Sequence, residues 1–129
     1  MAKPKRPSVF TAQDYIGNQV VLYQQTWDVH ICAPDNHPQM LGYENLVKSI
    51  IEDPYLVHPS TTDPKSLAFV SDQGQGPTGA GVRVLVRYDN MLFPKGASTG
   101  LVVTAYPIEP AYTRPNLGPA IYTKGKDKP

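Results

Sequence analysis

The sequence predicts an α+β fold in which an N-terminal β-hairpin and two helices precede a three- to four-stranded antiparallel sheet. Three observations support this fold. Two β-prone runs flank a Gly-Asn pair near the N-terminus, residues 41–52 are amphipathic at helical spacing, and alternating apolar segments follow them. A chain of 129 residues is long enough for one domain with one hydrophobic core.

The first predicted element is the hairpin, made of SVFTA at 8–12 and QVVLYQ at 19–24. The Gly17-Asn18 pair between the two runs is a turn signal. The stretch 26–32 then predicts a short helix, with Thr26 accepting a hydrogen bond from an amide of the first turn. Pro34 and Pro38 prevent this helix from continuing.

The clearest helical pattern covers residues 41–52, where apolar side chains recur at roughly helical spacing. Asp53-Pro54 ends the pattern, because proline disfavours helical geometry in the preceding residue. We expect Leu46, Val47 and Ile50 to be buried against the strand at 81–89.

Four later segments are predicted strands: 55–59, 66–71, 81–89 and 101–108. In the third, the apolar side chains Val82, Val84, Val86 and Tyr88 alternate with Arg83, Leu85 and Arg87. Helices covering one face of such a sheet would leave the other face free for a ligand or partner. The glycine-rich stretch 74–81 lacks the Gly-Lys-Ser/Thr ending of a phosphate-binding loop, so we interpret it as a hairpin loop.

The expected organisation is a basic tail over residues 1–7, one domain over 8–108, and a proline-rich extended arm over 109–129. The arm has too few periodic apolar residues to pack independently. We expect its Tyr112, Ile121 and Tyr122 to lie on the domain's own surface or on a neighbouring chain.

Charge and cysteine content limit the possible functions. The formal net charge is +1, but residues 7–123 carry six basic and ten acidic side chains. We therefore expect no double-stranded DNA partner, since duplex binding normally needs a contiguous basic patch. A single cysteine, Cys32, is too few for a disulfide or a cysteine-based zinc site. Without an apolar membrane span or signal peptide, the chain is expected to be cytoplasmic and to make no membrane contact.

Two histidines near the first predicted helix are candidates for chemistry. His30 follows Trp27 by three residues, and the interpretation we slightly favour is that it packs the helix against the sheet. His37 precedes Pro38, where it would cap or brace the next helix. Together with His58 these residues lack the spacing of a metal site, so we expect no metal and no cofactor.

The strands offer a second candidate site. Arg83 and Arg87 share one face about 13 Å apart and could each meet a phosphate, and Lys95 adds a third cation. Thr104 and Tyr106 share a face of the last strand. Hydroxyl groups beside arginines suit cleavage of a phosphodiester without a metal. Solvated arginines and a half-buried Thr and Tyr are the alternative, and this alternative is at least as frequent.

The order of four motifs resembles a known family. VVLYQQTWDVHI, NHPQM, IIEDP and VVTAYP follow one another over about residues 8–108. Together they resemble the phage-type branch of the barnase, colicin and RelE-like ribonuclease fold, a group of small bacterial and phage proteins. Its pattern has Trp then His-Ile, a His-Pro-Glu-Met-like turn, Asp-Pro after a helix, and a closing Thr-Ala-Tyr or Thr-Ala-Phe. Gln39 stands where the pattern carries Glu, which removes one possible general base, and Glu44 is the nearest substitute.

The resemblance implies a nuclease-like domain that cleaves RNA without a metal ion. It implies catalytic roles for His30, His37, Thr104 and Tyr106, and it carries over Trp27 as an RNA-binding residue. The phosphate- and RNA-binding cations would be those already found on the strands and the connection between them, Arg83, Arg87 and Lys95. Such an endoribonuclease would be a toxin or a phage-derived effector acting on cellular RNA, with a protein partner or cognate inhibitor. The alternative is a catalytically inactive module of the same fold that binds protein or RNA. The acidic body and Gln39 favour the alternative, and the two histidines with Thr-Ala-Tyr favour the enzyme.

Overall fold

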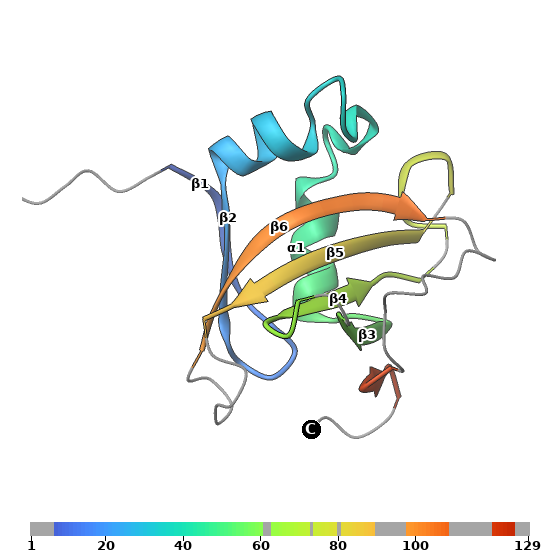
Figure 1. The fold of residues 1–129 in the computed structure, drawn as a ribbon. Helices are drawn as coiled ribbons and strands as arrows, with labels where there is room; N and C mark the ends of the chain where they lie inside the picture. Colours follow the sequence, from blue (N-terminus) through green and yellow to red (C-terminus); the bar gives the residue numbers. More distant parts are fainter. Residues whose placement is uncertain are drawn as a thin grey trace, which may run out of the picture.

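Over the residues that it describes, the computed structural model shows a seven-stranded mixed β-sheet with one α-helix (Figure 1). The structure describes residues 7–60, 63–72, 74–79, 81–89, 98–108 and 120–125. The strands are β1 (Ser8–Gln13), β2 (Gln19–Tyr23), β3 (Leu56–Pro59), β4 (Ser66–Val70), β5 (Gly81–Tyr88), β6 (Thr99–Ile108) and β7 (Tyr122–Thr123). Their order across the sheet is β1-β2-β6-β5-β4-β3-β7.

The predicted architecture of a hairpin, two helices and a three- to four-stranded antiparallel sheet is wrong. β1 and β2 do form a hairpin, but β2 continues into the sheet by pairing in parallel with β6. Gly100 of β6 stands opposite Val20, and a Cβ atom there would lie 2.7 Å from Val86 Cγ1. The sequence pattern identified these strands, but a parallel pairing between segments so far apart leaves no local signal.

The helical segment before the sheet is also different from the prediction. Within the described ranges only α1 (Glu44–Glu52) is an α-helix; η1 (Thr26–Ile31) is a π-helical turn, and η2 (Pro38–Met40) and η3 (Pro77–Gly79) are 3₁₀ turns. In η1 the amide of Cys32 donates to the carbonyl of Trp27, five residues back, at 2.8 Å. Thr26 does not cap this turn, because it lies inside it. Leu41, predicted to be helical, precedes α1 and is 69% exposed.

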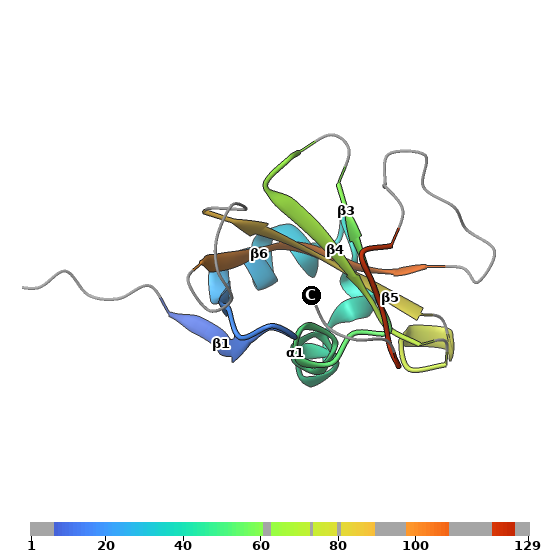
Figure 2. The ribbon, with the colours of Figure 1, turned by 90° about the horizontal axis from the view of Figure 1, so that it is seen from below.

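The core lies between α1 and one face of the sheet (Figure 2). Val47, Ile50 and Ile51 of α1 are at most 2% exposed. The predicted alternation along β5 is confirmed, because Val82, Val84, Val86 and Tyr88 are all buried in the same core. Leu46, predicted to be buried, is only partly so.

The last described segment supplies β7, the edge strand of the sheet beside β3. β7 pairs with β3, and the Tyr122 ring lies 5.0 Å from the ring of Tyr15, in the turn between β1 and β2. Tyr15 also meets Phe69 of β4 edge to face, at 5.7 Å. Residues from opposite ends of the strand order therefore touch, so the sheet curves around its core. Tyr122 was expected to lie on the domain's own surface or on a neighbouring chain; it packs on the domain and is 7% exposed, but its place in a strand paired with β3 was not predicted.

Several expectations fall outside the described residues. These are the basic tail up to Arg6, most of the predicted arm including Tyr112 and Arg114, and Lys95. Within the described part of the chain, none of the helices has the length and apolar character needed to cross a membrane.

Candidate functional site

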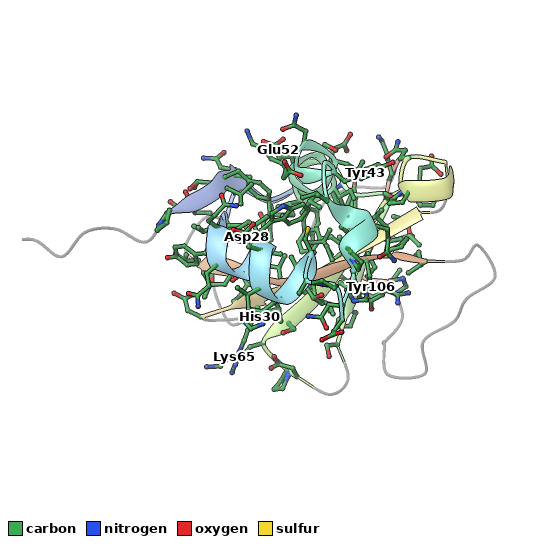
Figure 3. All side chains as sticks on the ribbon, turned by 90° about the horizontal axis from the view of Figure 1, so that it is seen from above. Asp28, His30, Tyr43, Glu52, Lys65 and Tyr106 are labelled. Atoms are coloured by element: carbon green, nitrogen blue, oxygen red, sulfur yellow. The ribbon has the colours of Figure 1, made fainter. Side chains whose placement is uncertain are left out.

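The face of the sheet opposite α1 gathers most of the predicted site residues. The register of β5 and β6 places Arg83 opposite Tyr106, Leu85 opposite Thr104, and Arg87 opposite Leu101. Side chains of directly opposed residues point to the same face, so the two arginines and two hydroxyls share one surface. In Figure 3 the labelled His30, Lys65 and Tyr106 lie toward one side of the sheet, whereas Glu52 and Tyr43 lie on the side of α1.

Arg83 is a buried cation without a carboxylate partner in the described part of the chain. It is 4% exposed, and its Nη1 donates to the Tyr106 hydroxyl at 3.3 Å. Its Cζ also lies 5.7 Å from the centroid of the Tyr106 ring. Nε is buried and has no hydrogen-bond partner. The two ion pairs among described residues use other cations, Arg87 and Lys124.

His37 completes this group from the segment before η2. Its ring centroid lies 5.2 Å from that of Tyr106, and the two planes are 31° apart. Its amide donates to the carbonyl of Ile31 at 2.8 Å, which holds the segment against the end of η1. Tyr106 thus contacts His37 through its ring and Arg83 through its hydroxyl. His37 stands at the N-cap of η2 and its carbonyl accepts the Met40 amide at 3.0 Å, but its side chain makes no hydrogen bond that caps η2.

His30 and Thr104 line a hollow of about 380 Å³ between η1 and β6. The hollow is bounded by Tyr23, Thr26, His30, Leu101, Val102, Val103 and Thr104. His30 is exposed, so the packing role that the sequence slightly favoured for it belongs to Trp27 and Ile31 alone. π-helical turns such as η1 often occur at functional sites. Thr104 and Tyr106 lie about 7 Å apart along β6, which connects this hollow to Arg83.

A second hollow of about 470 Å³ lies farther along β6, lined by Lys65, Arg87, Tyr88, Asp89, Thr99 and Leu101. Sequence reasoning missed Lys65, Thr99 and Leu101 as site residues. Lys65 comes near Arg87 because Ser66, the next residue, stands opposite Arg87 in the register of β4 and β5. The sequence does not reveal this register. Nε of Arg87 lies 3.6 Å from Asp63, and hydrogen bonds from the Ser66 hydroxyl and the Lys65 amide lower the pKa of that carboxyl.

Two other predicted residues do not reach this surface. Trp27 is 2% exposed in the core, so its ring is not presented to a base. Glu44, the nearest substitute for the missing Glu at position 39, accepts the Gly42 amide at 2.8 Å beside the start of α1. Lys95 lies outside the described residues.

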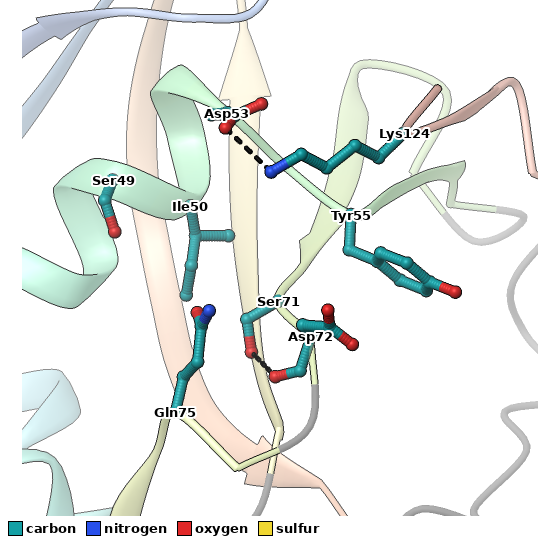
Figure 4. Close-up of a pocket in the computed structure, with 8 residues that line it drawn as sticks. All are labelled: Ser49, Ile50, Asp53, Tyr55, Ser71, Asp72, Gln75 and Lys124. Carbon is teal, nitrogen blue, oxygen red and sulfur yellow. Dashed lines mark hydrogen bonds and ion pairs between the residues drawn. The ribbon is translucent and has the colours of Figure 1, made fainter. Parts of the chain in front are cut away.

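A third cavity, of about 50 Å³, lies at the end of α1 near the C-terminal segment (Figure 4). It is lined by Ser49, Ile50, Asp53, Tyr55, Ser71, Asp72, Gln75 and Lys124. Lys124 Nζ donates to Asp53 at 2.9 Å, which ties the segment after β7 to the residue that follows α1 and raises the pKa of Lys124. A space of this size holds one or two water molecules, and we assign it a structural role.

Among the residues that the structure describes, no group of three or more His, Cys, Asp or Glu side chains could hold a metal ion. Comparison with protein-family models, with curated proteins and with solved structures found no match for this chain.

Proposed function

We propose that this protein is an endoribonuclease that cleaves cellular RNA without a metal ion and serves as a toxin or phage-derived effector. The observation that carries the proposal is Arg83, a guanidinium that is 4% exposed, has no carboxylate partner among the described residues, and contacts Tyr106, which also meets His37. A buried charge without a counter-ion costs several kcal/mol, so proteins rarely keep one without a reason.

A phosphate group is the natural partner for this arginine. Guanidinium groups form paired, charge-assisted hydrogen bonds with phosphate oxygens, and a site with low exposure strengthens such bonds. The neighbouring hydroxyls of Thr104 and Tyr106 can donate further hydrogen bonds to a phosphate on the same face. These features support a phosphodiester, rather than an uncharged ligand, as the bound group.

The same surface carries groups that can move protons. In the proposed reaction one imidazole, of His30 or His37, removes the proton from a ribose 2′-hydroxyl. The 2′-oxygen then attacks phosphorus, and the bond from phosphorus to the 5′-oxygen breaks while the other imidazole protonates that oxygen. Arg83 stabilises the additional negative charge on the phosphorane. The products are a 2′,3′-cyclic phosphate and a 5′-hydroxyl end.

The second candidate is a catalytically inactive module of the same kind that binds RNA or a protein partner. Two observations favour it: Gln39 replaces a carboxylate of the resembled pattern, and the body of the chain is acidic. Binding without cleavage would distinguish this module from the enzyme.

The test is cleavage of total RNA by the 129-residue chain, with and without EDTA, followed by analysis of the new ends. We expect cyclic phosphate ends in both conditions. His30→Ala or His37→Ala should slow cleavage on the order of 10²–10⁴-fold, the usual contribution of a positioned acid or base. His58→Ala is the matched control, since His58 stands on β3 opposite Ala68 of β4.

Each variant is first checked for folding by circular dichroism. RNA left intact by the wild type over a wide pH range, or a His30/His37 double variant that cleaves as fast as the wild type, would refute the catalytic assignment.

A further inference from the structure

We infer that the ligand of this surface is single-stranded RNA that runs along β6 and places one nucleotide on each side of Leu101. This inference rests on the proposed function and extends it by naming the strandedness of the substrate and a second binding position. The second position is the hollow around Lys65 and Arg87.

The two hollows lie on either side of one side chain. Leu101 lines both the hollow beside His30 and the hollow beside Lys65. Their volumes of about 380 and 470 Å³ are each in the range of pockets that hold small organic ligands. Two adjoining pockets of similar size suit a polymer with a repeating unit better than a single small molecule.

The two arginines of β5 are spaced along the surface in the same way as the two hollows. Arg83 stands opposite Tyr106 beyond the first hollow, and Arg87 stands opposite Leu101 at the second. The two arginines are four residues apart on one strand, a separation of about 13 Å along β5. A chain with several phosphates can meet both guanidinium groups, whereas a mononucleotide cannot.

A bulge in β6 gives the surface between the arginines its apolar character. Leu85 pairs with Thr104 and Val86 with Val102, so Val103 is an extra residue that faces no partner on β5. Leu101 and Val103 are therefore both presented to solvent, at 43% and 47% exposure. Bulges often redirect side chains next to binding sites. The apolar faces of unpaired bases can cover these side chains, but a duplex keeps those faces stacked inside.

The cations of the second hollow are available to a phosphate. The carboxylate of Asp89 accepts the Ser98 hydroxyl at 2.6 Å and the Thr99 amide at 3.1 Å. Asp63 accepts the Ser66 hydroxyl at 2.6 Å. Arg87 Nε lies 3.6 Å from Asp63, but the Arg87 side chain is 59% exposed, and Lys65 forms no ion pair within the described residues. Over residues 7–123 acidic side chains outnumber basic ones by ten to six, which disfavours the denser charge of a duplex.

The experiment measures binding by fluorescence anisotropy. The probes are labelled 2′-O-methyl RNA strands of about two, four and eight nucleotides and a duplex of the longest strand. These strands have no 2′-hydroxyl and are not cleaved. Wild type should bind the longer single strands more tightly than the shortest, and more tightly than the duplex.

Lys65→Gln should weaken binding of the longest strand about fivefold at about 0.1 M salt and reduce the salt slope by about 0.7, the contribution of one phosphate contact. Lys48→Gln is its control, because Lys48 lies on α1 and the change in charge is the same. Leu101→Ser should weaken the same complex without altering the salt slope. Leu41→Ser is its control, since Leu41 is an exposed leucine outside both hollows.

The outcomes separate this inference from the proposed function. If wild type binds RNA but Lys65→Gln and Leu101→Ser match their controls, or if the duplex binds best, the second position is refuted while the ribonuclease proposal stands. If wild type binds no strand of any length, both are refuted.

Discussion

At the scale of single residues, we expect Arg83 to lower the stability of the fold while it contributes to RNA cleavage. Replacing it with Met keeps most of the side-chain volume and removes a buried charge. We therefore expect Arg83→Met to raise the free energy of unfolding by about 1–2 kcal/mol in the absence of RNA. The same change should slow RNA cleavage by roughly 10²–10³-fold, because the phosphorane loses its cation.

Urea unfolding and a cleavage assay on the same preparation measure both effects. The comparison variant is Arg87→Met, whose side chain is 59% exposed and whose stability should change by no more than about 0.5 kcal/mol. If Arg83→Met is clearly less stable than the wild type, Arg83 is a structural residue rather than a cation kept for a ligand.

A second residue-scale effect concerns pH. The Tyr88 hydroxyl is buried and donates to Asp14 Oδ2 at 2.6 Å, and burial together with the Asp14 charge raises the pKa of Tyr88 well above its usual range. Burial also raises the pKa of Tyr15 to about 12. Both groups favour the protonated form in the folded state, whereas in the unfolded state they ionise near pH 10. The stability they confer is complete below about pH 10 and is lost as the pH rises further.

Tyr88→Phe tests two effects of this hydroxyl on stability: its hydrogen bond to Asp14 and its ionisation at high pH. At about pH 7 the variant should be less stable than the wild type by about 2 kcal/mol, since a hydrogen bond to a charged acceptor is lost. Between about pH 10 and pH 12 its stability should fall less steeply. Urea unfolding over this range makes the comparison, with the exposed Tyr55→Phe as control. Parallel pH profiles for all three proteins would exclude Tyr88 as the titrating group.

At the scale of elements, the short strand β7 is more important than its length suggests. Tyr122 is 7% exposed and packs against Tyr15, while its neighbour Ile121 is 48% exposed. Tyr122→Ala should therefore cost about 3 kcal/mol of stability, as for other buried aromatic side chains. Ile121→Ala should change stability by less than about 1 kcal/mol. Thermal unfolding of both variants gives the comparison; equal effects would mean that β7 does not contribute to the core.

The elements also show how far sequence reasoning could go. Period-two alternation placed β5 correctly and assigned Val84 to the core and Arg87 to the open face. It could not predict the π-helical turn. Trp27 and Ile31 are four residues apart, which is also the spacing of residues on one face of an α-helix. A two-residue strand such as β7 carries no periodicity, and the proline-rich composition around it favoured an extended arm.

At the scale of the whole molecule, the order of the strands in the sheet could not be predicted from the sequence. Strand patterns say which residues face the core but not which strand lies beside which, so the parallel pairing of β2 with β6 was missed. The candidate site could not be predicted as a whole for the same reason. The sequence identified Arg83, His37 and Tyr106 one at a time, but their proximity comes from the register of β5 against β6 and from the path of the chain after η1.

The pairing of β2 with β6 has a consequence for the protein while it is being made. A ribosome produces the β1–β2 hairpin before β6, so β2 has no neighbour on its second side until β6 has also been synthesised. Arg83 likewise meets Tyr106 only when β6 is available. Under the proposed function, a nascent chain therefore lacks its phosphate site until β6 has been synthesised, and the messenger and ribosomal RNA that surround it are spared until then.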